Sequence, residues 1–341
     1  MRTAREERFR KTRLDLSYRL DYPLVRPSKV IFLVTHRCPL KCVMCWTRGA
    51  DQTSELPAVE VLSMIDQASA WGVPEVMFSG GEPFLRLDDV AVFVRRSSEL
   101  GLLSSVITSG WLMTPEKMER LYDAGLNVLM FSIDGPDAAT HDAIRGVPGS
   151  FDRIVGAIRM ASGFRGMPRP HVPDEALAEK FVIGTMSVVM DQNAHLLPRI
   201  HDLLSGLGAD FMDFQAVTAD PGNAAQWVKK ENLAALKTGL EEIVRRNANE
   251  RRVMHSDEYL RAIVRYFEDP GARLRTRCMA GFGEMIVTAQ GEVSTCFGNV
   301  PQAGGGTPDL RRLWRAPAFR PVRRKIRSCT RPCIIACWSG Q

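Results

Sequence analysis

Between Lys29 and Val217 the chain alternates six times between a short apolar stretch and an amphipathic stretch with helical spacing. This alternation is typical of parallel β/α units, in which helices cover strands that are buried on both faces. Six such units fit an open, partial (β/α)6 barrel that is TIM-like, with its chemistry at the carboxyl ends of the strands. The strands are expected at Lys29–Thr35, Glu75–Ser79, Leu103–Ser109, Asn127–Asp134, Lys180–Met190 and Asp210–Val217.

Helices are expected between these strands, with start signals that the sequence makes explicit. The clearest is Thr114 as an N-cap with Pro115 at the first helical position. The segment Gly163–Glu179 carries three prolines, interrupts the alternation and is expected to be a surface insertion that serves as a lid. The expected helices are Pro57–Trp71, Asp88–Leu100, Thr114–Ala124, Ser150–Ser162 and Ala194–Leu204.

The sequence divides into four parts. Residues 1–27 form a charged N-terminal arm, 28–217 the barrel, 218–277 a helical connection and 278–341 a small module rich in Gly, Arg and Cys. Helices are expected in the connection at Asn223–Asn247 and Ser256–Phe267. In the last part, Glu284–Thr288 and Glu292–Thr295 are expected to form a hairpin that turns at Gln290-Gly291.

Composition bounds the class of protein. The 341 residues are 45% apolar, enough for a large core, and the chain has no apolar run long enough to span a membrane. Eight cysteines without a secretory signal favour a reducing cytoplasm. Nine Arg or Lys and no acid lie between Arg311 and Arg331; they are expected to form an exposed, solvated helix face or, alternatively, an electropositive rim that attracts an anionic substrate or carrier. The lack of interleaved aromatics disfavours nucleic acid.

Three cysteines, Cys38, Cys42 and Cys45, lie within eight residues in the spacing C-x₃-C-x₂-C, directly after the first strand. Three thiolates so close together suit a 4Fe–4S cluster and leave one iron open for another molecule. A zinc site completed by His36 is the alternative. A disulfide framework does not fit an odd number of thiols.

This spacing resembles the signature of the radical S-adenosylmethionine (radical SAM) family. The resemblance implies that the open iron is chelated by SAM and that reductive cleavage of SAM yields a 5′-deoxyadenosyl radical, which abstracts a substrate hydrogen atom. An electron donor such as flavodoxin or ferredoxin is then required. Gly80, Gly81, Glu82 and Pro83 at the end of the second strand resemble the family's GGEP motif, which holds the amino group of SAM.

Further polar residues lie at the ends of the next strands. Ser132 and Asp134 resemble the family residues near the SAM ribose, and Arg145 the one near the SAM carboxylate. Ser109 stands where the family pattern has Asn, so its contact is less secure. A strand-end cap or turn is the alternative for each.

The C-terminal cysteines follow a second pattern. This pattern resembles the SPASM or twitch module of the same family. It consists of Cys278, twelve residues, Gly291, four residues and Cys296, followed by a cluster of cysteines. Five cysteines suffice for one auxiliary 4Fe–4S cluster with one thiol left over. Zinc is the alternative metal. The five are Cys278, Cys296, Cys329, Cys333 and Cys337.

These features predict a radical SAM oxidoreductase or epimerase. The 27 residues before the barrel are too few for a peptide-recognition domain, which favours a small polar substrate such as a sugar or cyclitol of an antibiotic pathway. A spare thiol among Cys329, Cys333 and Cys337 would donate a hydrogen atom in an epimerase; otherwise it is an inert buried thiol. The alternatives are a peptide or protein maturase with a separate recognition partner, and a non-catalytic iron–sulfur or zinc protein that binds a partner.

Overall fold

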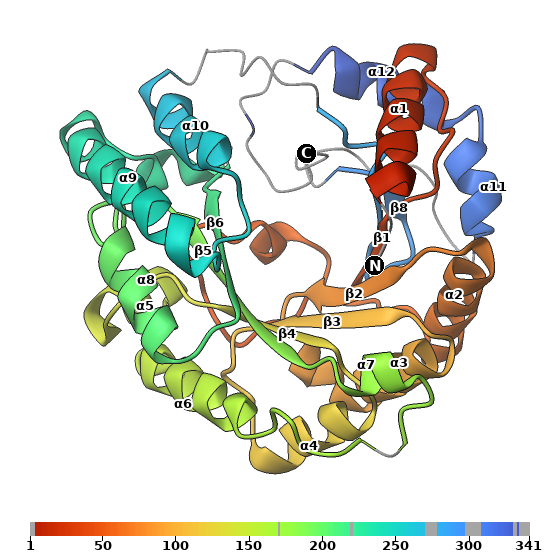
Figure 1. Cartoon of the computed structure of the whole chain (residues 1–341), viewed down its shortest axis with the longest axis horizontal. Coiled ribbons are helices and arrows are strands. Elements are labelled where there is room, and N and C mark those ends of the chain that lie inside the picture. Colours follow the sequence, from red (N-terminus) through yellow and green to blue (C-terminus); the bar gives the residue numbers. More distant parts are fainter. Residues whose placement is uncertain are drawn as a thin grey trace.

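The computed structural model describes residues 4–169, 171–218, 221–269, 278–296, 308–329 and 333. Eight strands of these residues form one curved sheet in the order β6-β5-β4-β3-β2-β1-β7-β8. Strands β1 to β6 are all parallel to their neighbours, and helices cover the outside of the sheet (Figure 1). The predicted α/β fold with a parallel sheet is therefore confirmed.

The strands agree with prediction to within three residues at each end. They are β1 (Lys29–Thr35), β2 (Glu75–Gly80), β3 (Leu103–Thr108), β4 (Val128–Ser132), β5 (Val182–Val189), β6 (Phe211–Ala216), β7 (Glu284–Val287) and β8 (Val293–Ser294). The helices are α1 (Ala4–Leu20), α2 (Ala58–Trp71), α3 (Leu87–Glu99), α4 (Pro115–Asp123), α5 (Ala138–Arg145), α6 (Ser150–Ser162), α7 (Glu175–Ala178), α8 (Leu197–Gly206), α9 (Leu233–Glu250), α10 (Asp257–Glu268), α11 (Leu310–Arg315) and α12 (Phe319–Arg327).

The two faces of the sheet have different surroundings. On β1, Val30, Phe32 and Val34 point outward into the large core between sheet and helices. Ile31 and Leu33, the residues between them, point inward and pack with Met77, Met130 and Ile286 from other strands. Because side chains alternate along a strand, this assigns an inner face to every strand by register.

The segment after α6 lies at the amino end of the strands. Arg169 donates from Nη1 to Leu126 O at 2.6 Å, and Asn127 Nδ2 donates to Leu177 O and Lys180 O. Leu126 and Asn127 directly precede β4, whereas the predicted site lies at the opposite end of the sheet. The prediction that this segment serves as a lid is therefore wrong, because the segment packs at the amino ends of the strands.

Two regions flank the sheet at its two edges (Figure 1). At the β6 edge, Met212 N donates to Arg252 O and Met254 N to Met212 O, so residues 252–254 cover the last strand. The α-helix predicted from Asn223 begins only at Leu233, and two 3-10 helices, Pro221–Gln226 and Lys230–Asn232, precede it. Asp191 accepts from Lys229 N and Asn232 Nδ2 and so fixes this segment.

At the other edge, the predicted C-terminal hairpin is present as antiparallel β7 and β8, and β7 pairs in parallel with β1. The hairpin therefore continues the barrel sheet. Helix α1 of the N-terminal arm packs here, with Leu14 against Met279 and Phe282. Among the helices that the model describes, none has the length and apolar character needed to cross a membrane.

Candidate functional site

The first three cysteines lie on the loop that leaves the carboxyl end of β1. None of them is in a disulfide; Cys42 is buried, and Cys38 and Cys45 are partly exposed. Burial raises the pKa of the Cys38 thiol to about 12, and it also raises the pKa of Cys42. Burial therefore favours the protonated form of the Cys38 and Cys42 thiols until something that binds thiolates displaces the protons.

The backbone of this loop is held by the end of α5. Lys41 N donates to Arg145 O at 3.0 Å, and Val43 N donates to Ile144 O at 2.9 Å. Gly146 follows with a φ of 70°, and a Cβ there would lie 2.5 Å from Lys41 O. Only glycine fits at that position, so α5 can end against the cysteine loop.

The Gly80-Gly81 pair packs against the start of the same loop. A Cβ on Gly80 would lie 2.2 Å from Thr35 O, and one on Gly81 would lie 2.1 Å from Arg37 O. The space saved by the glycines is filled by protein backbone: Gly81 N donates to Thr35 O at 2.7 Å. The glycines thus fix the end of β2 to the residues that precede Cys38.

Glu82 is fully buried at the junction of β2 and β3. Its Oε1 accepts from Thr108 Oγ1 at 2.8 Å, and its Oε2 accepts from Ser109 N at 2.9 Å. Pro83 is also buried and begins a short 3-10 helix. The structure therefore brings Glu82 and Ser109 together, beside the cysteine loop.

Asp134 and Arg145 form a buried ion pair, with Oδ2 and Nη2 2.7 Å apart. Asp134 also accepts from Val188 N at 2.8 Å, and Arg145 Nη1 lies 3.7 Å from Cys42 Sγ. Burial raises the pKa of Asp134, although Arg145 opposes this. The geometry makes Asp134 a residue that positions Arg145 beside the thiol. Ser132, at the end of β4, is only partly buried.

The positions of the three thiols distinguish a zinc ion from an iron–sulfur cluster. Among the described residues, no three His, Cys, Asp or Glu side chains are grouped closely enough for a single metal ion. A zinc ion needs its sulfur ligands about 3.8 Å apart, from Zn–S bonds of about 2.3 Å in a tetrahedron. In a four-iron cluster each cysteine binds a different iron, so the sulfur atoms lie further apart than around one zinc ion. Three cysteines on one loop, with the Arg145 guanidinium beside Cys42, therefore fit such a cluster.

In the C-terminal part, Cys278 and Cys296 flank the β7–β8 hairpin and both pack beside Val322 and Ile326 of α12. Cys329, just after α12, is exposed, and it is an electrostatic neighbour of Cys278 together with Cys296. Cys333 is partly exposed, and Cys337 lies outside the described residues. Cys278 and Cys296 therefore lie together beside α12, and Cys329 follows the end of the same helix.

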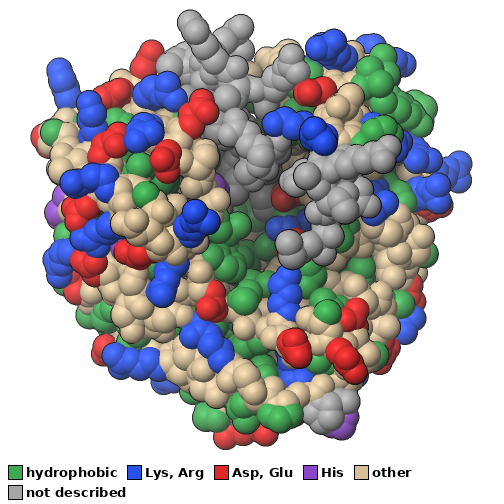
Figure 2. Space-filling model, viewed as in Figure 1, with side chains coloured by type: hydrophobic (Ala, Val, Ile, Leu, Met, Phe, Trp, Pro, Cys, Tyr) green, Lys and Arg blue, Asp and Glu red, His purple; other side chains and the backbone are tan. Residues whose placement is uncertain are grey.

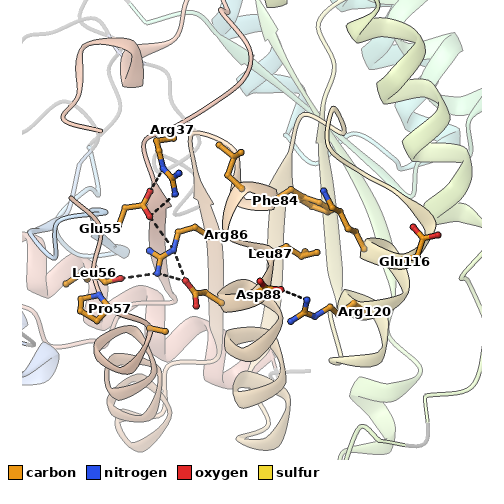
Figure 3. A pocket seen from close by; sticks show the side chains of 14 residues that line it. Arg37, Glu55, Leu56, Pro57, Phe84, Arg86, Leu87, Asp88, Glu116 and Arg120 are labelled. Atoms are coloured by element: carbon orange, nitrogen blue, oxygen red, sulfur yellow. Dashed lines mark hydrogen bonds and ion pairs between the residues drawn. The ribbon is translucent and has the colours of Figure 1, made fainter. Parts of the chain in front are cut away.

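A cavity of about 840 Å³ lies outside the barrel, between the starts of α2, α3 and α4 (Figure 3). Glu55 joins Arg37 at 2.8 Å and Arg86 at 3.6 Å. Arg86 also donates to Val34 O at 2.8 Å. This network holds the end of β1 through the hydrogen bond from Arg86 to Val34 O. None of the predicted site residues lines the cavity.

Sequence reasoning missed one polar pair on the inner face. Asp213 of β6 and His255 are both buried, with Oδ1 and Nε2 2.6 Å apart. The available signal was an acid in the middle of a buried strand, where an unpaired carboxylate would be costly. Its partner lies 42 residues further along the chain, which no local pattern indicates.

Comparisons with known proteins agree with this geometry. The family model described as the radical SAM superfamily matches residues 32–169. The chain is 28% identical to the AdoMet-dependent heme synthase of Methanosarcina barkeri, over 87% of this chain and 85% of that protein. It is 30% identical to the PqqA peptide cyclase of Rhodopseudomonas palustris, over 87% of this chain and 76% of that protein.

Among solved structures, the chain is similar in fold to Streptococcus suis SuiB. The SuiB structure with S-adenosylmethionine gives a TM-score of 0.67 at 18% identity, covering 87% of this chain and 68% of SuiB. The structure with the precursor peptide SuiA gives 0.68 at 18% identity, covering 92% and 70%. At this identity the likeness concerns the fold.

Proposed function

The chain belongs to the radical SAM superfamily, and we propose that it is a peptide- or protein-modifying member of it. Its cofactors are S-adenosylmethionine and a 4Fe–4S cluster. The sugar or cyclitol substrate expected from the sequence has no support in the comparisons. The peptide maturase, expected as the alternative, has the better support, because one relative is a peptide cyclase and SuiB was solved with a precursor peptide.

The observation that carries the proposal is the meeting of the cysteine loop, Glu82 and Arg145 at the carboxyl ends of β1 to β4. When bound, the cluster and SAM supply the 5′-deoxyadenosyl radical that removes a substrate hydrogen atom. Cys38, Cys42 and Cys45 would hold the cluster. The loop Gly80–Pro83 with Ser109, and Ser132 with Arg145, would line the SAM site.

Within this site each residue has a physical task. The carboxylate of Glu82, fixed by Thr108 and Ser109, is an acceptor for the ammonium group of SAM. Arg145 is a donor for its carboxylate and is positioned by Asp134. Burial of Cys42 and Glu82 keeps water away from the loop, which protects a reactive radical.

The auxiliary cluster belongs to the same proposal. Cys278, Cys296 and Cys329 would supply three ligands, because the first two pack against α12 and the third follows its last residue. Cys333 or Cys337 would supply the fourth and leave the other thiol spare. Single Cys→Ala variants with iron content measured for each identify the spare thiol as the one whose loss leaves iron unchanged.

The proposal is tested on anaerobically reconstituted protein, with flavodoxin or dithionite as electron donor. Release of 5′-deoxyadenosine from SAM is expected, and its absence excludes the enzyme reading in favour of a partner-binding protein. Synthetic peptides encoded beside the gene are then assayed for loss of hydrogen mass and for deuterium transfer into 5′-deoxyadenosine. Iron coproporphyrin III is the competing probe, because another relative, 32% identical over 55% of this chain, is an Fe-coproporphyrin III synthase. Turnover of the porphyrin alone would overturn the peptide assignment.

A further inference from the structure

Asp213 and His255 have no task in the cofactor site, although both are titratable and buried. Asp213 is 4% exposed and His255 is 7% exposed, and Oδ1 and Nε2 lie 2.6 Å apart. Two ionisable groups in such a place cost folding free energy unless they are paired. A pair of this kind on the inner face of a barrel is a candidate for proton transfer.

The register of the sheet sets the depth of this pair. Ser132 of β4 pairs with Met186 of β5, and Met186 pairs with Asp213 of β6. Side chains in register on parallel strands share a face, and Met186 packs in the inner cluster. Asp213 is thus on the inner face at the level of Ser132, two strands away, or about 10 Å at about 4.8 Å per strand.

The interior at this level is lined by partly exposed side chains. Met186 and Phe211 are only partly buried in the inner cluster, and Gln215, two residues beyond Asp213, is partly exposed. Figure 2 shows a hollow at the centre of the molecule in the view of Figure 1, with hydrophobic side chains on its floor. A substrate that meets a radical formed near Ser132 therefore has Asp213, with His255 bound to it, two strands away on the same inner face.

The pair is held in one orientation. Gln215 Nε2 donates to Asp213 Oδ2 at 2.6 Å, so both carboxylate oxygens are engaged. The His255 ring stacks on Tyr259 with centroids 3.9 Å apart and 24° between the planes. The backbone before His255 is anchored to Met212 by hydrogen bonds. A side chain that accepts a proton in catalysis has to be held in position before the reaction, and these contacts hold both side chains of the pair.

We propose that the Asp213–His255 pair accepts the proton that the substrate loses after hydrogen-atom abstraction, which deepens the proposed function and rests on it. In the tautomer that donates Nε2–H to Asp213, His255 Nδ1 carries the lone pair that accepts a proton. The Asp213 carboxylate then stabilises the imidazolium. The pair thus commits the substrate to net oxidation.

The proposed reaction removes one hydrogen atom, one proton and one electron from the substrate. A substrate C–H bond breaks and its hydrogen atom forms the 5′ C–H bond of 5′-deoxyadenosine. An N–H, O–H or C–H bond next to the substrate radical then breaks, its proton goes to His255 Nδ1, and its electron pair forms the new bond of the product. The remaining electron leaves to a one-electron acceptor of the iron–sulfur class. The substrate loses two hydrogen atoms in all.

His255→Gln and Asp213→Asn test this proposal, with His201→Gln as the matched control. His201 is equally buried and lies 3.5 Å from Glu250, but it is on α8, outside the barrel. The assay uses SAM and the synthetic peptide that wild type converts. Iron content and deuterium transfer into 5′-deoxyadenosine should stay at wild-type values. Product formed per 5′-deoxyadenosine should fall at least about tenfold in the two pair variants only.

Chemical rescue separates a proton acceptor from a structural pair. His255→Gly leaves a space for a free ring, so added imidazole should restore product without changing SAM cleavage. A wild-type product ratio in folded His255→Gln, an equal loss in His201→Gln, or no effect of imidazole would overturn the proposal. If wild type releases no 5′-deoxyadenosine, or converts no peptide, it is the proposed function that fails.

Discussion

The two groups of cysteines in this molecule are built in opposite ways. Cys38, Cys42 and Cys45 lie on one loop, and backbone hydrogen bonds from Arg145 and Ile144 hold that loop. Cys278 and Cys296 flank the β7–β8 hairpin, whereas Cys329 follows α12, further along the chain. The first group needs only the barrel to be in place, whereas the second needs distant segments to be brought together.

This difference predicts how each site depends on its cluster. A loop that the barrel already orders has little conformational entropy left to lose when ligands bind. Segments gathered from a hairpin and from the end of α12 have more to lose, so ligand binding contributes to their folding. The barrel site should therefore survive loss of the C-terminal site, while the C-terminal module should not survive loss of its own cluster.

The largest effect is expected from the triple variant Cys38→Ala, Cys42→Ala, Cys45→Ala. SAM cleavage should disappear, because these are the thiols on the loop beside Glu82 that would hold the cluster. The fold should persist, since the loop is held through backbone groups. Release of 5′-deoxyadenosine and circular dichroism provide the two measurements. Cleavage that survives would show that the cluster is held elsewhere.

The next effect concerns Cys278→Ala. Iron should fall from about eight to about four per chain, at about four per cluster, while SAM cleavage continues and product is lost. The C-terminal module should become sensitive to proteolysis. Iron of about twelve in the parent protein would contradict a single auxiliary cluster. Equal loss of SAM cleavage would show that the two sites depend on each other and form one unit.

A smaller effect is expected from His141, which accepts from Asp134 N and so supports the barrel site. Burial lowers its pKa from 6.5 to about 3. Between these values the unfolded chain binds a proton that the folded chain does not, so the free energy of unfolding falls as pH drops through 6.5. At pH 5 this cost is about 2 kcal/mol.

His141→Gln keeps an acceptor for Asp134 N but cannot be protonated. Between pH 7.5 and pH 5, wild type should therefore lose about 2 kcal/mol more stability than the variant. Urea unfolding at the two pH values measures the difference. If the free energy of unfolding of both proteins changed equally with pH, His141 would take up a proton in the folded protein as readily as in the unfolded chain. The barrel site would then not be rigid enough to exclude that proton.

The sequence predicted those parts of the fold that depend on local pattern. Strand β1 and helix α6 have the bounds that were expected. Helix α5 was missed, because eight residues give little periodicity and its tertiary contacts hold it. The parallel pairing of β7 with β1 joins residues some 250 positions apart and leaves no local trace.

The candidate site divides in the same way. Cysteine spacing predicted three ligands, a role that stays a prediction, and strand order placed Glu82 and Arg145 at the same end of the barrel. The burial of Asp134 could not be predicted, because it depends on Val188 and Arg145, which come from other elements. The Asp213–His255 pair has the same origin, in a contact across 42 residues.

The smallest effect is expected from the basic residues of α11 and α12. The basic run is not exposed along its whole length, because Arg323 is only 1% exposed. Its side chain donates hydrogen bonds to Gly281 O and Trp314 O. Its guanidinium group also lies over the rings of Phe282, Trp314 and Phe319. Burial lowers its pKa to about 10. It is therefore a structural residue, and Arg331 lies outside the described residues. The exposed cations are Arg311, Arg312, Arg315, Arg320, Arg324, Lys325 and Arg327.

Two of these, Arg324 and Arg327, pair with Asp21 and tie α12 to the N-terminal arm. The other five would attract an anionic substrate or carrier, and exposed charges are screened beyond about 8 Å at physiological salt. Raising the salt should therefore raise the KM for such a molecule a few-fold and leave kcat unchanged. Arg311→Gln with Arg312→Gln should reproduce the change at low salt, and Arg96→Gln, on α3, should not. A KM independent of salt would mean that the exposed cations serve solubility alone, and that the C-terminal module acts only through its thiols.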